Sequence, residues 1–232
     1  MTIEELTEKC AYRNVVLSEP MQEQLLNYAA LLKEWNEKIN LTAITDLPEV
    51  IEKHFFDCLL PLGEEPLSGT VCDVGSGAGF PGLVLKIARP DLALTILEPT
   101  NKKCLFLKEA VSKLDLKNVE IRPERAEDFA INSREIFDVV TARAVAPLAV
   151  LAELCLPLVK VSGRFLAMKG TQGMEEAEEA ARAVQVLGAG KPVIHQESLS
   201  TGDTRINLWY PKAQKTPAGY PRPYAKIRKR PL

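Results

Sequence analysis

Residues 71–82 of the chain read VCDVGSGAGFPG, an apolar segment followed by a turn with glycines at positions 75, 77 and 79. Glycines at this spacing allow a tight turn and let a ligand approach the backbone where a strand passes into the next helix. The stretch therefore predicts a nucleotide-type binding site at the end of the first strand of an α/β sheet.

Short apolar runs alternate with helical patterns from Thr70 onward. This alternation predicts a mostly parallel sheet covered by helices on both faces. The helical patterns are PGLVLKIA, KKCLFLKEAVSKL, PLAVLAELCLPLV and the segment from Met174 to Leu187. The last two apolar runs are expected to pair as a hairpin at the sheet edge. The seven predicted strands are TVCDV, LALTILE, NVEIR, FDVVTA, GRFLAMK, PVIHQESL and RINLWY.

Residues 1–62 have helical patterns instead. Thr2 and Glu5 have the spacing of a capping box. Apolar residues then recur every three or four positions, as on one face of a long helix, at Leu25, Tyr28, Ala29, Leu32, Trp35 and Ile39. We expect Asn40 to cap this helix, a further helix from Pro48 to Leu60 and a linker over 61–69. The chain thus divides into a helical N-terminal extension (1–62), an α/β domain (63–210) and a Pro-rich tail (211–232).

The composition excludes several protein classes. The chain has 232 residues, of which 46% are hydrophobic, and 29 Lys and Arg against 31 Asp and Glu, as in ordinary soluble proteins. The acidic N-terminus lacks a secretory signal, and two prolines and Glu153 interrupt the longest apolar stretch, so we expect a cytoplasmic protein without a membrane span. Five scattered cysteines without C-x-x-C spacing predict no metal site.

The charge is unevenly distributed along the chain. Residues 205–232 contain eight Lys and Arg and no acidic residue, whereas residues 1–204 contain 21 basic and 31 acidic residues, a charge of −10. Basic segments of this kind supply phosphate contacts in nucleic-acid-binding proteins. The tail is therefore either a polyanion-binding appendage or a solvated end.

The charge of the glycine turn separates two kinds of ligand. GAGFPG matches the dinucleotide fingerprint, and Glu98 at the end of the second strand is placed to bind a ribose. Asp73, however, would repel a pyrophosphate at the mouth of the loop. The cationic S-adenosylmethionine suits this loop better, so a methyltransferase is favoured over a dinucleotide enzyme. The alternative for Asp73 is a structural one, capping of its own turn.

Other candidate site residues follow the remaining strands. Residues 124–129 follow the third strand, where an acidic group and backbone amides would recognise an adenine edge. Arg143 ends the fourth strand and is placed to meet cofactor, base or phosphate, or else a local carboxylate. Phe80 either contacts the cofactor or fills the interface between helix and sheet. Lys169, at the end of the AMK strand, faces the same crevice and is a candidate contact for RNA phosphate, or an ordinary strand-end lysine.

The motifs that amine and cytosine-C5 methyltransferases carry after the fourth strand, Asn/Asp-Pro-Pro-aromatic and Pro-Cys, are missing from this chain. A target with an exposed lone pair, such as N7 of guanine, fits because it needs no general base. His54 and Asp57 lie one turn apart on a predicted helix and form either a substrate-contacting or a structural pair. His195 and Trp209 are expected to pack in the terminal hairpin.

The chain resembles the RsmG (GidB) family, the bacterial 16S rRNA guanine-N7 methyltransferases. The resemblance rests on stretches between Leu25 and Arg222, namely WNEKINLTAIT, HFFDCLL, VCDVGSGAGFPGLVLKIARPDLALTILEPTNKKCLFL, RAEDF, DVVTARAVAPL, LAMKG and KTPAGYPR. It implies a Rossmann-like class I methyltransferase that transfers methyl from S-adenosyl-L-methionine to N7 of one guanine in the decoding-region hairpin of 16S rRNA. Ala-Gly at 218–219 departs from the lysines common in such tails.

The resemblance also assigns roles to the candidate residues. The expected contacts of the methionine part of the cofactor are Gly75, Gly77, Gly79 and Phe80, together with the loop residues Asp73 and Ser76. Glu98 is expected to bind the ribose, and Ala126 and Glu127 the adenine. Arg143 is expected to lie against both cofactor and target guanine and to be the catalytic residue. The candidate RNA contacts are Lys169, His54, Arg222, Lys226 and Arg228. The expected partner is 16S rRNA or the 30S subunit, bound by a monomer, with no DNA. A non-catalytic assembly factor and a small-molecule methyltransferase remain as alternatives.

Overall fold

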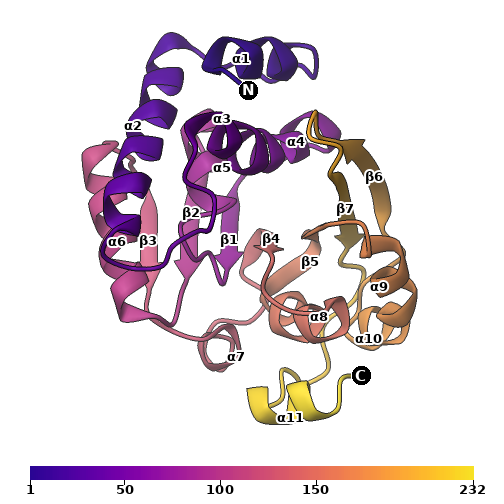
Figure 1. Cartoon of the computed structure of the whole chain (residues 1–232). Helices are drawn as coiled ribbons and strands as arrows, with labels where there is room; N and C mark the ends of the chain where they lie inside the picture. Colours follow the sequence, from indigo (N-terminus) through magenta and orange to yellow (C-terminus); the bar gives the residue numbers. More distant parts are fainter.

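The computed structural model describes residues 1–232 and has one seven-stranded sheet with helices on both sides (Figure 1). The strand order is β3-β2-β1-β4-β5-β7-β6. All neighbours pair in parallel except β7, which runs antiparallel to both β5 and β6. The strands are β1 (Thr70–Val74), β2 (Ala93–Leu97), β3 (Val119–Arg122), β4 (Phe137–Arg143), β5 (Val159–Lys169), β6 (Val193–Ser198) and β7 (Thr204–Pro211).

This arrangement confirms the predicted parallel sheet and the terminal hairpin at its edge. The strand order reverses between β1 and β4, which is the point where open α/β sheets bind ligands outside the carboxyl ends of their strands. Asp73 of β1 is in register with Thr141 of β4. The register therefore brings the glycine turn after β1 and Arg143 at the end of β4 to the same edge.

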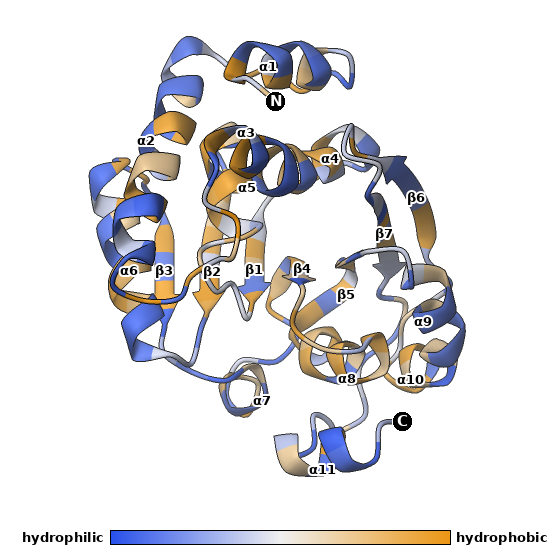
Figure 2. Cartoon of the chain, in the orientation of Figure 1, coloured by the Kyte–Doolittle hydropathy of each residue, from blue (hydrophilic) through white to orange (hydrophobic).

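Two apolar layers cover the sheet, and Figure 2 shows hydrophobic colour concentrated on its strands and on the helix faces against it. Along β1, Val71 belongs to one layer and Cys72 to the other, as the alternation of a strand requires. One layer includes α1 to α6 and the other α7 to α11. The helices are α1 (Ile3–Ala11), α2 (Glu19–Asn36), α3 (Leu47–Val50), the π-helical η1 (Ile51–Phe56), α4 (Asp57–Glu64), α5 (Gly82–Ala88), α6 (Asn101–Lys113), α7 (Ala126–Phe129), α8 (Leu148–Cys155), the 3-10 turn η2 (Leu156–Leu158), α9 (Gly173–Glu179), α10 (Ala181–Val186) and α11 (Tyr224–Lys229).

The N-terminal helices form largely where they are predicted. The capping box of α1 is confirmed, since the Thr2 N–H donates to Glu5 at 2.7 Å and the Glu5 N–H to the Thr2 hydroxyl at 3.2 Å. The predicted cap at Asn40 is wrong, because α2 ends four residues earlier, at Asn36. The Asn36 side chain there accepts the backbone N–H groups of Leu41 and Thr42 at 2.8 and 3.0 Å and turns the chain away.

The predicted helix over 48–60 is longer and less regular than expected. It consists of α3, η1 and α4 in succession and continues through Pro61 to Glu64, into the predicted linker. Leu59, Leu60 and Pro61 are buried in the core. Tertiary packing therefore outweighs the helix-breaking propensity of proline at this position. The predicted single helix over 174–187 is, conversely, interrupted at Ala180 between α9 and α10.

The C-terminal segment, which the sequence presents as a Pro-rich tail, packs on the α/β domain. The Lys212 side chain is 0% exposed, and its Nζ donates to the Leu156 carbonyl at 2.6 Å and to the Thr216 hydroxyl at 2.7 Å. Ile227 of α11 is fully buried in the layer that contains α8. Both terminal parts share core layers with the sheet, so packing does not mark boundaries between the three parts. The division into 1–62, 63–210 and 211–232 stays a prediction. None of the helices combines the length and apolarity that a membrane crossing requires.

Candidate active site

The glycine turn after β1 offers open backbone at one position. Gly75 and Gly77 have φ values of 69° and 60°, in the left-handed region that favours glycine. A Cβ atom at Gly77 would meet no atom nearer than the Gly75 carbonyl oxygen at 4.0 Å. At Gly82, in contrast, a Cβ atom would lie 2.7 Å from the Asp73 carboxylate. Gly77 therefore leaves room for a ligand, whereas the last glycine of the GAGFPG match serves internal packing.

Asp73 supports this turn from inside the protein. Its side chain is fully buried, and Oδ2 accepts hydrogen bonds from the Ser76 hydroxyl and, at 2.9 Å, from the Gly82 N–H. Oδ1 has no hydrogen-bond partner. Burial raises the pKa of Asp73 to about 6. The capping role considered for Asp73 is thus confirmed for one oxygen, and the other oxygen is a buried acceptor without a donor.

Glu98 joins the glycine turn to the end of β2. Its Oε2 accepts the Gly77 N–H at 3.0 Å and its Oε1 accepts the Thr100 N–H at 2.9 Å. The residue is 3% exposed. A carboxylate oxygen accepts more than one hydrogen bond, so both oxygens keep capacity for a further donor such as a ribose hydroxyl. The predicted ribose residue and the predicted loop therefore lie in direct contact.

The predicted adenine-side residues begin the short helix α7, which follows β3 beyond the same edge of the sheet (Figure 1). Ala126 and Glu127 are both buried, and burial raises the pKa of Glu127 above its ordinary value. Open backbone at Gly77, the Glu98 carboxylate and α7 thus border one edge, with an unpartnered Asp73 oxygen behind the turn. This donor and acceptor set fits the positively charged S-adenosylmethionine.

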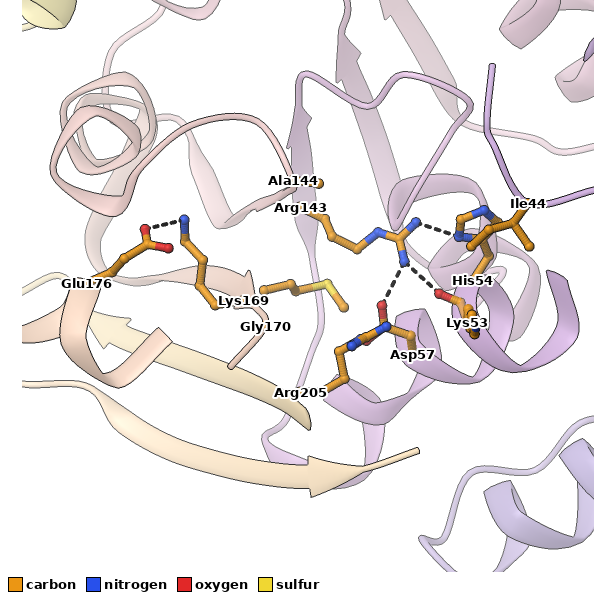
Figure 3. Close-up of a pocket in the computed structure, with 11 residues that line it drawn as sticks. Ile44, Lys53, His54, Asp57, Arg143, Ala144, Lys169, Gly170, Glu176 and Arg205 are labelled. Atoms are coloured by element: carbon orange, nitrogen blue, oxygen red, sulfur yellow. Dashed lines mark hydrogen bonds and ion pairs between the residues drawn. The ribbon is translucent and has the colours of Figure 1, made fainter. Parts of the chain in front are cut away.

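Arg143 at the end of β4 is held on three sides (Figure 3). Its Nη1 donates to Asp57 Oδ2 at 2.7 Å and to the Lys53 carbonyl at 3.2 Å, and its Nη2 lies 3.0 Å from His54 Nδ1. The guanidinium also lies over the Phe80 ring, 5.1 Å from its centroid. The side chain is 15% exposed. Arg143 therefore occupies one defined position, where it both pairs with a local carboxylate, Asp57, and lines the cavity at the crevice.

His54 and Asp57 do not form the pair expected from their spacing, because both contact Arg143 rather than each other. Burial, and next the charge of Arg143, lower the pKa of His54 to about 3, so the ring is neutral at physiological pH. The ring stacks on Phe80 with centroids 4.4 Å apart. Phe80 itself is 5% exposed and lies 5.6 Å from Tyr28, centroid to centroid. Phe80 thus fills the helix–sheet interface, and its contact with the cofactor stays a prediction.

A cavity of about 380 Å³ opens beside Arg143 and contains polar groups from distant parts of the chain (Figure 3). Lys169 lies on its wall, with Nζ 2.8 Å from the Ala146 carbonyl and 2.6 Å from Glu176 Oε2. Arg205 of β7 contributes a further cation, with Nε 3.2 Å from Asp57 Oδ1. Arg205 and Glu176 are absent from the sequence-based set, since only strand pairing and helix packing bring them here.

The predicted RNA residues of the C-terminal segment separate into two groups. Arg222 donates from Nε and Nη2 to the buried Glu153 carboxylate at 2.8 and 2.5 Å, so it is an internal anchor rather than an exposed cation. Lys226 and Arg228 lie on α11 with exposed side chains. α11 packs beside α7, where the Arg125 guanidinium lies 5.3 Å from the Tyr224 ring centroid. α11, a short helix fastened to the domain, therefore carries Lys226, Arg228 and Lys229, three of the five exposed basic residues of the tail.

Known solved structures share the fold of this chain. The YcgJ protein from Bacillus subtilis superposes with a TM-score of 0.54 at 14% identity, covering 69% of this chain and all of that one. TYW2 from M. jannaschii, solved in complex with AdoMet, gives a TM-score of 0.51 at 14% identity, covering 63% of this chain and 71% of that one. At these identities the likeness concerns the fold alone.

Sequence comparison is more specific. Proteins named ribosomal RNA small subunit methyltransferase G from Staphylococcus aureus strains RF122 and JH9 are 45% and 44% identical to this chain, over all of it and 99% of their own length. The model of the GidB family, described as rRNA small subunit methyltransferase G, matches residues 21–205. With these matches across the glycine turn, Glu98 and Arg143, the chain belongs to the GidB family of small-subunit rRNA methyltransferases.

Proposed function

We propose that the protein transfers the methyl group of S-adenosylmethionine to N7 of one guanine in the decoding-region hairpin of 16S rRNA. The observation that carries this proposal is the junction at Arg143, where an acidic glycine-turn site meets a cavity bordered by cations. The acidic side suits a cationic cofactor, and the side with Lys169 and Arg205 suits a polyanion. Family membership and the printed names of the Staphylococcus aureus relatives support rRNA as the acceptor.

The residues of this chain bind and orient the reactants. Gly77 and Glu98 would hold the methionine and ribose parts of the cofactor, and Ala126 and Glu127 would enclose its adenine. The bound cofactor supplies an electrophilic methyl group on a sulfonium. N7 of guanine has a lone pair and no proton, so the protein need only position it. Arg143 is the proposed catalytic residue, which would donate to the neighbouring O6 acceptor.

The His54 ring is not free to act as a general base, which agrees with an N7 acceptor. His54 is neutral, but its Nδ1 faces Arg143 at 3.0 Å and its Nε2 faces the Thr42 hydroxyl at 2.8 Å. Both ring nitrogens are thereby occupied. His54 therefore contributes to RNA recognition through the surface it builds with Arg143 and not through a ring nitrogen.

We place the reaction in the cytoplasm, with a monomer acting on 16S rRNA within the 30S subunit or an assembly intermediate. Lys169, Lys226 and Arg228 are the proposed phosphate contacts. The net charge of −2 gives little general attraction to RNA. We infer that recognition depends on an RNA shape organised by ribosomal proteins, in line with the way structured RNA is commonly read.

The test is transfer of labelled methyl from S-adenosylmethionine to small subunits that lack N7-methylguanine, with mapping of the product by cleavage at N7-methylguanine. Subunits already methylated at that guanine are the matched control. Label at one guanine of the unmethylated subunits is the expected result. Label on small molecules but not on RNA would make the protein a small-molecule methyltransferase, and subunit binding without label would make it a non-catalytic assembly factor.

A further inference from the structure

The Asp57 carboxylate is buried between two arginines that come from different strands. Its side chain is 4% exposed, with Oδ2 2.7 Å from Arg143 Nη1 and Oδ1 3.2 Å from Arg205 Nε. Transfer of charged groups from water into the protein interior is unfavourable, so a buried cluster of this kind is poor evidence for stability by itself. Oδ2 holds Arg143 by a hydrogen bond, whereas Oδ1 has no hydrogen-bond donor and attracts Arg205 by charge alone. The carboxylate thereby acts on the positions of both guanidinium groups at the wall of the cavity.

The π-helical turn η1 presents the acceptors that hold Arg143. π-Helical segments are rare and occur frequently at functional sites. Here the Lys53 carbonyl and His54 Nδ1 lie in η1, and Asp57 begins the next helix. Together they take three N–H groups of Arg143. Arginine has five such donors, so Nε–H and one Nη2–H remain free for a ligand.

The protonation of His54 follows from its contacts. The Arg143 guanidinium can only donate, so His54 Nδ1 must accept and the proton of the neutral ring lies on Nε2. Nε2–H then donates to the Thr42 hydroxyl at 2.8 Å, which also accepts the Ile44 N–H at 3.0 Å. The loop after α2 thereby holds the ring in the orientation that receives Arg143.

We propose that Asp57, assisted by His54, is a positioning residue for methyl transfer, which aligns Arg143 and Arg205 at the acceptor cavity. The helical N-terminal segment is then part of the active site, although it lies outside the strands and turns that bind the cofactor. The inference rests on the proposed function, since it assigns how Arg143 is made ready for the guanine.

A double-mutant cycle tests whether Asp57 acts through Arg143. The variants are Asp57→Asn, Arg143→Lys and the double variant, and the readout is the single-turnover rate of methyl transfer at saturating S-adenosylmethionine and unmethylated small subunits. Asparagine keeps an acceptor oxygen for Arg143 but carries no charge, so it loses the attraction to Arg205 and weakens the contact with Arg143. We expect Asp57→Asn to lower the rate about 100-fold, the size of effect that misplacing a reacting group by about 1 Å produces.

The single-turnover rate of the double variant is expected to be at most about threefold lower than that of Arg143→Lys, because residues that act as a unit give non-additive losses. A loss equal to the product of the two single losses would overturn the proposal, as would full activity of Asp57→Asn. Retained activity in Asp57→Glu, with a side chain long enough to bridge both arginines, would further support positioning.

The matched control is Glu49→Gln, in the same helical segment. The Glu49 carboxylate pairs with Lys53 Nζ at 2.8 Å and does not touch Arg143. Its rate is expected to match the parent protein. Cofactor affinity and melting temperature are measured for every variant, and a rate loss in Asp57→Asn that tracks lost cofactor affinity or lost folding would overturn the proposal. Absence of label with the parent protein would instead reject the proposed function itself.

Discussion

Substitution of Arg222 by methionine tests whether the C-terminal segment is part of the folded domain. The backbone N–H, Nε and Nη2 of Arg222 all donate to the Glu153 carboxylate, at 2.9, 2.8 and 2.5 Å. The Glu153 side chain is 0% exposed and that of Arg222 is 15% exposed. In Arg222→Met this carboxylate stays buried and keeps only the backbone donor.

Removing one partner of a buried ion pair costs about 3–5 kcal/mol. We expect about 3 kcal/mol, the lower end of this range, because the backbone N–H still donates and water reaches the edge of the vacated site. For a chain of this length, a destabilisation of about 3 kcal/mol lowers the melting temperature by roughly 6–12 °C. The cost arises from the unpaired carboxylate and not from the lost arginine as such.

Equilibrium urea unfolding at pH 7, followed by tryptophan fluorescence and circular dichroism, measures the free energy of unfolding. The double variant Arg222→Met/Glu153→Leu removes both charges and is expected within about 1 kcal/mol of the parent protein. A single variant as stable as the parent, or a double variant as unstable as the single one, would refute the reasoning. Unchanged stability with reduced RNA affinity would return Arg222 to the RNA-binding surface.

Three further variants test the candidate site. Arg143→Ala should lower single-turnover transfer at least about 100-fold while cofactor affinity by calorimetry changes little, and full activity would remove Arg143 from the site. Lys226→Gln/Arg228→Gln should flatten the slope of log affinity for RNA against log salt by about 1.5, since each lost phosphate contact contributes about 0.7–0.9. Lys113→Gln, at the far end of α6, is the control, and equal slopes would make α11 a bystander. Burial raises the pKa of Asp73 to about 6, so the ionised carboxylate destabilises the fold of the parent protein. The free energy of unfolding of Asp73→Asn, relative to that of the parent, should therefore rise by up to about 3 kcal/mol between pH 3 and pH 8. A difference independent of pH would contradict this.

The fold and the placement of the glycine turn, Glu98 and Arg143 at one edge of the sheet could be predicted from the sequence, because they rest on short-range patterns. Alternation of strand and helix periods predicts the parallel sheet, and the glycine spacing predicts the turn after β1. Carboxyl ends of parallel strands meet at one edge, so Glu98 and Arg143 were expected near that turn. Each of these inferences needs only a few neighbouring residues or a general rule of sheet topology.

The partners of charged side chains required the tertiary structure. Asp57 precedes Arg143 by 86 residues, and Arg222 follows Glu153 by 69. Spacing along the helix instead suggested a pair of His54 with Asp57. Nor does any local pattern distinguish the π-helical turn over 51–56 from ordinary helix.

Composition shows that the C-terminal segment is basic, but it does not show that this segment packs on the α/β domain. The strands and the glycine turn follow from short stretches of sequence, because backbone propensity and side-chain period act over a few residues. Packing between distant segments makes Arg222 an anchor, leaves Lys226 exposed and brings Asp57 against Arg143. A charged side chain pairs with whichever group the completed fold buries beside it, and that choice depends on contacts between segments far apart in the chain.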